Sequence, residues 1–373
     1  MKNYWFLIII PILGLQLSCS EEHNQRKAWT FLLYDDADFS NAYDPLNDFS
    51  KLVSSDSIIN YLVLRDGDST KASYYQIGKN HEQILLRELD ELNMGDKSTL
   101  ENFLKYAKKY FPAERYIVAF YDHGGGWQGA CWDMTSQSDN LTAAEMNDAL
   151  MNYGGVDLVL FTAPCLMGSI ESAYQFRKST KYYIGSESPS GFSFWNGMLD
   201  KLDTLLKNNS TITSNDLSRE IITLHEKYKN ANGYGALITM SAIDLSKMNN
   251  LIVSLNKVTN YYLDNIDKFK SIFPYYIKKY SSDYCDLLGL LESLRVNDPD
   301  ILLKNKLAET INLFKECLVA ECHGESTIGS NGLNIYMPSK KNSSEIYYLP
   351  YGKGLDFKSD CSWDQLLSKY LKN

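Results

Sequence analysis

The chain of 373 residues contains no internal repeat, no low-complexity tract and no proline- or glycine-rich linker. The missing linker favours one folded unit over two independent domains. After the first residues there is no second hydrophobic run long enough to span a bilayer. Basic residues are fewer than acidic ones, with 37 Lys and Arg against 46 Asp and Glu, which gives a net charge of -9. Such a chain has no electrostatic reason to bind nucleic acid or anionic lipid headgroups.

The first residues predict a secretory signal. Lys2 is followed by an apolar run from Trp5 to Leu17 that is short and interrupted by Pro11. Such a run is too short to span a bilayer comfortably, so residues 1–18 are expected to be a signal peptide instead of a transmembrane helix.

Ser18-Cys19 at the end of this run is similar to a bacterial lipoprotein signal, in which Cys19 is lipidated and becomes the new N-terminus. Gln16 stands where leucine is usual, and ordinary cleavage is the alternative. We expect residues 19–27 to be a lipidated N-terminus and linker, with the membrane contacted only through this lipid. The expected location is the cell envelope, as an outer-membrane lipoprotein, and the acidic Ser20-Glu21-Glu22 suggests surface display.

Strand patterns alternate with helical ones over the first half of the chain. We expect strands at 30–34, 58–64, 116–121, 156–161 and 182–186, helices at 45–55, 100–110, 141–151 and 169–177, and a short amphipathic piece at 81–89. Asp44, Ser98 and Asn140 are the expected N-caps. This order predicts an α/β fold with a mostly parallel sheet and helices on both faces. Later segments are helical, at 216–228, 247–265, 282–294 and 302–320, before a strand at 332–337 that is expected to return to the sheet.

His123 and Cys165 each follow directly after a predicted strand and precede a turn. In an open α/β sheet the reacting groups lie beyond the carboxyl ends of the strands. We therefore expect an imidazole and a thiol at the same edge of one sheet. Taken singly, each has an ordinary structural explanation, as a polar strand end and a small buried hydrophobe.

The turns that contain these two residues resemble the clostripain family of cysteine peptidases, in the caspase-like clan. The resemblance rests on His123-Gly124 after one strand and on Cys165-Leu166-Met167-Gly168-Ser169 after another. Similar segments occur in the family's order at 29–38, 93–95, 241–248 and 332–339, so that the resemblance covers residues 28–370. It implies a caspase-like α/β/α sandwich in one peptidase domain, residues 28–373, with a core over 28–200 and helical additions and a returning strand over 201–373.

The resemblance implies a cysteine endopeptidase that acts on a peptide or protein substrate. A thiol is mostly protonated at neutral pH, so Cys165 needs a neighbouring imidazole, and a helix N-terminus near Gly168 would help. His123 would be that partner. In the family the oxyanion donors are backbone N–H groups, here those of Gly124 and Cys165.

The expected substrate pocket departs from the family pattern. Relatives commonly have Asp two residues before the nucleophile to pair with a basic substrate side chain, but here Ala163 stands there. No Lys or Arg lies between residues 123 and 165, where relatives are often matured by self-cleavage. We therefore expect neither a strong Arg or Lys preference nor self-processing in this interval. Glu187 is a candidate replacement acid, although a solvated carboxylate is the simpler interpretation, and Trp195 is a candidate pocket wall.

Two alternatives come from other functional classes. The segment from Gly124 to Gly129 fits the G-x-G-x-x-G pattern of dinucleotide-binding proteins, but residues 131–140 are expected to form a loop where that fold needs a helix. A surface binding protein that keeps the peptidase fold without its activity is the second alternative, because Ala163 and Pro164 precede the thiol.

The proposed chemistry requires no cofactor and no metal. Asp35, Asp36 and Asp38 follow one another closely at the first strand, and some relatives respond to calcium, so a calcium site is an alternative to a solvated strand end. Cys317 and Cys322, with the adjacent histidine, lack the spacing and fourth ligand of a common zinc site and are expected to pack structurally.

Overall fold

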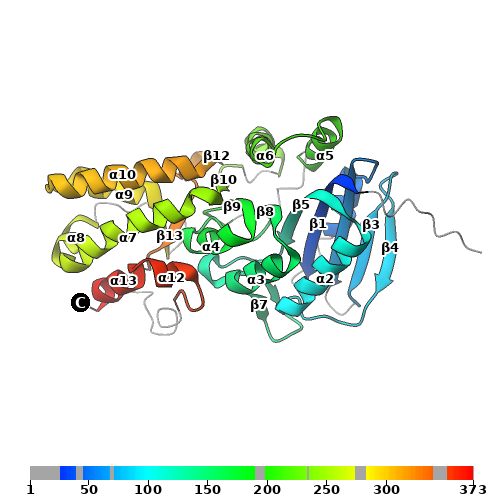
Figure 1. The fold of residues 1–373 in the computed structure, drawn as a ribbon, viewed down its shortest axis with the longest axis horizontal. Helices are drawn as coiled ribbons and strands as arrows, with labels where there is room; N and C mark the ends of the chain where they lie inside the picture. The colour runs from blue at the N-terminus through cyan, green and yellow to red at the C-terminus, as the bar shows by residue number, and fades with distance from the viewer. Residues whose placement is uncertain are drawn as a thin grey trace, which may run out of the picture.

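Nine strands form the central sheet of the computed structural model (Figure 1), in the order β12-β10-β9-β8-β5-β1-β2-β3-β4. The model describes residues 26–38, 45–67, 71–189, 198–232, 235–273, 283–338 and 351–372. The strands are β1 Lys27–Ala37, β2 Ile59–Gly67, β3 Ser73–Ile77, β4 Gln83–Glu88, β5 Ala113–Tyr121, β8 Val156–Phe161, β9 Thr180–Gly185, β10 Thr239–Asp244 and β12 Leu318–His323. The central strands β9, β8, β5, β1 and β2 pair in parallel, and antiparallel pairing adds two strands at each end. The predicted mostly parallel sheet is confirmed.

Helices cover both faces of this sheet. In β1 the side chains of Phe31 and Leu33 enter one buried cluster, whereas those of Leu32 and Tyr34 enter the other, as the two-residue period of a strand requires. The first cluster is completed by α1 Pro45–Leu52, α5 Leu199–Asn208 and α6 Ser214–Tyr228. The second is completed by α2 Lys97–Tyr110, α3 Ala143–Tyr153 and α4 Ile170–Gln175. Because both faces are covered, the central strands are apolar almost throughout.

The second half of the chain adds a group of helices at one end of the sheet, beyond β10 and β12 (Figure 1). They are α7 Met248–Asp264, α8 Ile266–Ile272, α9 Leu287–Asn297, α10 Ile301–Cys317, α12 Asp356–Asp360 and α13 Trp363–Leu371. A buried hydrogen bond between the hydroxyls of Ser254 and Thr310, at 2.8 Å, joins α7 to α10. None of the described helices has the length and apolarity that crossing a bilayer requires.

Two predictions about strands were wrong. The predicted strand at 332–337 does not return to the central sheet, because β13 Asn334–Tyr336 pairs with β11 Tyr284–Asp286 in a separate two-stranded sheet. β12 takes the outer position beside β10 instead. The segment 131–140 is not a simple loop, because β6 Ala130–Asp133 and β7 Asp139–Leu141 form a hairpin. The amphipathic piece at 81–89 contains β4, whose side chains are largely exposed at the sheet edge.

The predicted helix caps were shifted by two residues. Asp96 caps α2 in place of Ser98, whose backbone N–H it accepts, and Thr142 caps α3 in place of Asn140. Thr142 and Glu145 form a capping box, which satisfies two backbone donors at once. The third predicted cap, Asp44, lies outside the described residues.

Candidate active site

The turn that contains His123 is held by the hairpin that follows it. The backbone N–H of Cys131 donates to the carbonyl of His123 at 3.1 Å. One carboxylate oxygen of Asp122 accepts from the backbone N–H of Trp132 at 2.6 Å. The imidazole of His123 is exposed at the end of β5. The sequence therefore places this imidazole at the sheet edge, and the hairpin fixes the backbone below it.

Tyr284 of β11 holds the glycines after His123. Its hydroxyl accepts from the backbone N–H of Trp127 at 3.1 Å and donates to the carbonyl of Gly125 at 3.0 Å. Gly126 has a φ of 66°, and a Cβ there would collide with the Tyr284 ring. A short 3₁₀ turn, Gly126–Gln128, leads from here into β6, so the helix that a dinucleotide-binding fingerprint requires does not follow.

The turn that contains Cys165 is tied to two neighbouring strands. The hydroxyl of Thr162 donates to the carbonyl of Phe120 in β5 at 2.7 Å. The backbone N–H of Leu166 donates to the carbonyl of Ser188 at 3.2 Å, and that of Gly168 to the carbonyl of Ser186 at 2.7 Å. These bonds tie the Cys165 turn to the end of β5 and to the residues that follow β9. They hold Cys165 in a bend whose next residue, Leu166, adopts a φ of 62°.

The predicted helix after this turn is present but short. Ser169 caps α4 and accepts from the backbone N–H of Ser172 at 3.2 Å. The backbone N–H of Asn334 in β13 donates to the carbonyl of Gly168 at 2.8 Å. The separate two-stranded sheet of β11 and β13 therefore supports both turns, one through Tyr284 and the other through Asn334. Sequence reasoning missed these two supports, since their partners lie more than a hundred residues earlier in the chain.

The structure brings the two turns into direct contact. A Cβ placed on Gly124 would overlap the carbonyl oxygen of Cys165 and lie 2.7 Å from its backbone nitrogen. The main chain after His123 thus packs against the main chain of Cys165, and only glycine fits at position 124. This contact is the central geometric fact of the candidate site, because it places an imidazole-bearing turn beside a thiol-bearing turn.

Cys165 differs from the other described cysteines in its exposure. Its side chain is partly exposed, whereas the other five are buried, and none of the six is in a disulfide bond; the buried ones are Cys131, Cys285, Cys317, Cys322 and Cys361. Burial raises the pKa of Cys317 and Cys361 to about 12 and that of Cys131 well above its usual value. Thiols held in this way stay protonated and unreactive at neutral pH.

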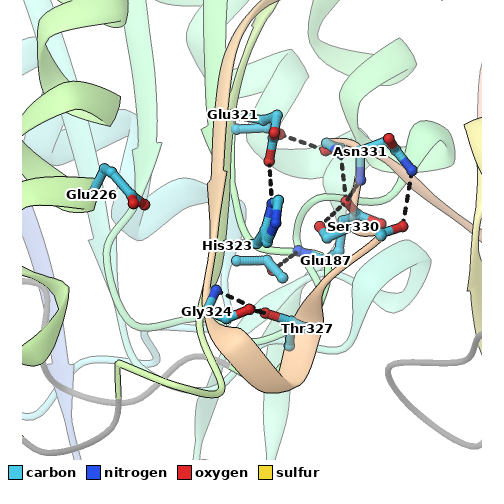
Figure 2. Close-up of polar contacts among 12 residues, drawn as sticks. Glu187, Glu226, Glu321, His323, Gly324, Thr327, Ser330 and Asn331 are labelled. Carbon is cyan, nitrogen blue, oxygen red and sulfur yellow. Dashed lines mark hydrogen bonds and ion pairs between the residues drawn. The ribbon is translucent and has the colours of Figure 1, made fainter.

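The other described histidines lie outside the two turns. The His81 ring lies 2.9 Å from the carbonyl of Val53, and His323 pairs with Glu321 at 3.0 Å (Figure 2). His225 is buried, and desolvation lowers its pKa to about 4. The structure thus leaves His123 as the described histidine beside the Cys165 turn.

Glu187 is buried, so the interpretation of a solvated carboxylate was wrong. One of its oxygens accepts from the hydroxyl of Ser330 at 2.5 Å and from the backbone N–H groups of Asn331 and Gly332 at 3.0 and 2.5 Å (Figure 2). Desolvation, and next the neighbouring carboxylate of Asp286, raise the pKa of Glu187 well above its usual value. Glu187 therefore holds the loop at 330–332 against the end of β9, directly behind the Cys165 turn.

Replacing Glu187 with glutamine is expected to reduce the loss of stability with rising pH. The raised pKa lets the folded protein keep a proton that the unfolded chain releases above about pH 4.3, so this group weakens folding as pH rises from there, by up to about 1.4 kcal/mol per pH unit. A neutral amide keeps the acceptor for the three donors and removes the titration. Thermal unfolding between about pH 5 and pH 8 should show a flatter curve for Glu187→Gln, whereas Glu187→Ala, which loses the acceptor, should be less stable at every pH.

The remaining predicted pocket residues lie in different settings. Ala163 is buried in an apolar cluster that includes Ile184. No carboxylate therefore stands at this position. Trp195 and the predicted lipidation site Cys19 lie outside the described residues.

A separate cavity of about 740 Å³ opens at the opposite edge of the sheet. Its lining includes Ala113, Val156 and Thr180, which stand at or near the amino ends of β5, β8 and β9. Its basic residues are Arg26, Lys108, Arg177, Lys178 and Lys181. This cavity is remote from the carboxyl ends where His123 and Cys165 lie, so it is not the cleft in which they would act.

The carboxylates at the end of β1 are buried and not solvated, which corrects the simpler interpretation of this strand end. Asp35 and Asp36 have no exposed surface and Asp38 is 8% exposed. Burial raises the pKa of Asp38 to about 6, and that of the neighbouring Asp66 and Asp122 to about 7. The carboxylate of Asp38 lies close enough to raise the pKa of Asp66 and of Asp122 further, and Asp122 directly precedes His123.

Comparison with known sequences identifies the family. The model of the clostripain family matches residues 33–370. The chain belongs to the clostripain family. Clostripain of Hathewaya histolytica is 25% identical over an alignment that covers 89% of this chain and 79% of that protein.

Solved structures show the same fold. A secreted C11 cysteine protease from Bacteroides thetaiotaomicron, solved with an irreversible peptide inhibitor, has a TM-score of 0.67 and 20% identity, and the match covers 90% of this chain and 99% of that one. An inactive zymogen C11 protease from Parabacteroides distasonis has a TM-score of 0.64 and 17% identity, covering 90% and 98%. The fold is thus the caspase-like α/β fold of these proteases, and membership of the clostripain family supports a peptidase, hence hydrolase, function.

Proposed function

We propose that this clostripain-family chain is a cysteine endopeptidase that cleaves peptide bonds with Cys165 and His123. The observation that carries the proposal is the packing of the turn after His123 against the main chain of Cys165. The partial exposure of Cys165, among otherwise buried thiols, supports it.

The proposed reaction follows from the two turns. His123 takes the proton from the Cys165 thiol, and the sulfur attacks the substrate carbonyl carbon. The backbone N–H groups of Gly124 and Cys165 would stabilise the negative oxygen, since these two residues adjoin. His123 then donates its proton to the leaving amine as the carbon–nitrogen bond breaks. Water, deprotonated by His123, hydrolyses the resulting thioester and restores the thiol.

Thiol labelling separates an active peptidase from a binding protein that only keeps the fold. At neutral pH, iodoacetamide should modify the Cys165 peptide first, and the five buried cysteines only after unfolding, because burial keeps the reagent from them. Mass spectrometry of the digested protein measures each site. Substitution of His123 by alanine should slow the labelling of Cys165. A Cys165 that reacts no faster than a free thiol, with or without His123, would favour the binding protein.

We further propose that the enzyme lacks a strong preference for Arg or Lys before the scissile bond. Ala163 supplies no charge, and the Glu187 carboxyl is buried and accepts three hydrogen bonds from the loop at 330–332. A peptide library cleaved by the wild type, with Cys165→Ala as the blank, tests this preference. Exclusive cleavage after basic residues would contradict it.

The absence of Lys and Arg between residues 123 and 165 supports a chain that is not self-processed there. The purified protein should therefore run as one band on a denaturing gel.

We also propose that Cys19 is lipidated and attaches the protein to the outer membrane. Intact-mass analysis of the native protein beside Cys19→Ser should show a lipid on the wild type alone, and masses that differ only by the exchange of sulfur for oxygen would rule out the anchor.

A further inference from the structure

A groove with a volume of about 390 Å³ runs between α2 and the β3–β4 hairpin. Figure 1 shows α2 beside this end of the sheet, and Tyr74 of β3 packs against Tyr106 of α2 with ring centroids 4.5 Å apart. One wall of the groove is the face of α2 from Thr99 to Tyr110. The opposite wall contains Arg87 of β4.

The charge of this groove has one sign. Among the described residues that line it, three are basic and none is acidic: Arg87 stands on the hairpin wall, and Lys105 and Lys109 stand on the helix wall. The whole chain is acidic, with a net charge of -9. A groove lined by cations alone is therefore a local reversal of the protein's charge, and such a reversal attracts anions.

Two of the three cations form no ion pair within the described part of the chain. The side chain of Arg87 has neither an ion pair nor a hydrogen bond there, since the carboxylate of the adjacent Glu88 pairs with Lys71 at 2.6 Å instead. The ammonium of Lys109 lies 4.8 Å from the centre of the Tyr110 ring and has no carboxylate partner. Both charges are thus available to a ligand.

The third cation is only weakly held. Lys105 pairs with Glu101 at 3.3 Å across one turn of α2, and an exposed pair of this kind contributes little. Burial raises the pKa of Tyr74 and of Tyr106, and the positive charge of Arg87 opposes this rise in both. The Arg87 guanidinium therefore lies near the tyrosines and points into the groove.

The exposed aromatic surface of the groove is irregular. The rings of Tyr106 and Tyr110 are 4.7 Å apart and inclined at 47°, and Tyr110 is 41% exposed. Inclined rings do not form a flat platform on which bases stack in succession. They offer apolar contact area with a polar tip, which suits the mixed side chains of a peptide.

We propose that this groove binds an acidic segment of the protein substrate, with Arg87 and Lys109 as the partners of its carboxylates. The wall from Thr99 to Tyr110 is about 16 Å long, which matches about five residues of extended chain. A guanidinium suits a carboxylate, since it donates two parallel hydrogen bonds. The choice of a peptide ligand rests on the proposed peptidase function.

The groove lies away from the candidate active site. In the order of the sheet, four strand spacings separate β4 from β5, whose end carries His123, a distance of about 19 Å. An extended chain needs at least about six residues to cover it. The acidic segment would therefore lie at least that far from the scissile bond. It would strengthen substrate binding and leave the chemical step unchanged.

Paired substrates test the proposal. Each joins a sequence that the peptide library shows to be cleaved to a run of glutamates or of glutamines, through a flexible spacer of about six residues. Since each exposed ion pair contributes a factor of about two to five, the glutamate substrate should have a KM about tenfold lower at the same kcat. Screening by about 0.5 M NaCl should remove most of this difference. A spacer of about two residues, which cannot reach the groove, should also remove it.

Neutral variants test the named cations. Arg87→Gln and Lys109→Gln should each raise the KM of the glutamate substrate about twofold to fivefold, and the double variant should no longer distinguish the two substrates. Arg295→Gln is the matched control, because it neutralises an exposed arginine on α9, outside the groove. It should keep the full preference. Equal KM values for both substrates in the wild type would overturn the proposal, as would an undiminished preference in the double variant.

Binding without cleavage separates this proposal from the peptidase proposal. A fluorescent glutamate peptide should bind Cys165→Ala, measured by anisotropy, and bind more weakly when Arg87→Gln and Lys109→Gln are added. If the wild type cleaves no peptide but this binding is seen, the peptidase proposal fails and the groove stands as a site for acidic peptides. Binding of an oligosaccharide of uronic acids, with no binding of the glutamate peptide, would overturn the assignment to a peptide.

Discussion

Replacing Cys165 with alanine is expected to lower peptide hydrolysis by about 10⁴-fold or more, because the substitution removes the attacking sulfur and leaves only binding and oxyanion stabilisation. Replacing His123 with alanine should cost about as much, since nucleophile and base act as one unit. The double variant should be scarcely worse than either single one. Initial rates on a mixed peptide library, measured with each variant, give the comparison.

Cys317→Ala is the matched control, because it removes a buried thiol at the end of α10, on the helical part of the molecule. It should retain near wild-type kcat/KM. Substantial hydrolysis by Cys165→Ala, with unchanged dependence on His123, would show that another group attacks the substrate. If Cys317→Ala also loses activity although the protein stays soluble, the loss in Cys165→Ala could not be assigned to the missing nucleophile, because removing a buried thiol would be enough to cause it.

Replacing Gly124 with alanine is expected to lower kcat by about 10²–10³-fold, the cost of losing one oxyanion donor. The added methyl group would overlap the carbonyl of Cys165, and that neighbour is main chain, which cannot rotate away. One of the two turns must therefore move. The binding of substrate should change less than the chemical step, so KM should stay within a fewfold of the wild type.

Gly78→Ala controls for the loss of a glycine, because the new methyl group there would meet only the flexible end of the Glu82 side chain. It should be nearly neutral. If Gly124→Ala keeps its full kcat while the protein stays folded, the contact between the two turns does not support catalysis. A melting temperature far below that of the wild type would instead assign the loss to folding, and the circular dichroism of both variants distinguishes these outcomes.

The candidate site was predictable from the sequence because its key residues follow strands. The apolar run at 116–121 and that at 156–161 are strong signals for buried parallel strands. In a parallel sheet their carboxyl ends share one edge, and β5 pairs directly with β8. The approach of the His123 turn to Cys165 thus follows from neighbouring strands.

The supports of the site were not predictable in the same way. Tyr284, Asn334 and Glu187 act through partners that lie far away in the sequence, and a pattern of neighbours contains no sign of them. The sequence predicts the strand that contains Asn334 correctly but not its pairing partner. A short apolar strand can pair with any exposed strand edge of suitable length, and here it pairs with β11. Polarity alone predicts a solvated carboxylate at Glu187, because it does not reveal burial among hydrogen-bond donors.

Local periodicity and the two strand-end turns determined the fold class, the family resemblance and the residues for which we propose catalysis. Each depends on residues within a few positions of one another, and a chain encodes such short-range preferences directly. The tertiary structure decided which thiols are buried, which carboxylates are buried and which strand occupies each edge. Burial and pairing of this kind depend on contacts between segments that are far apart in the chain. Two segments with the same local pattern can therefore differ in burial, because different residues pack against them.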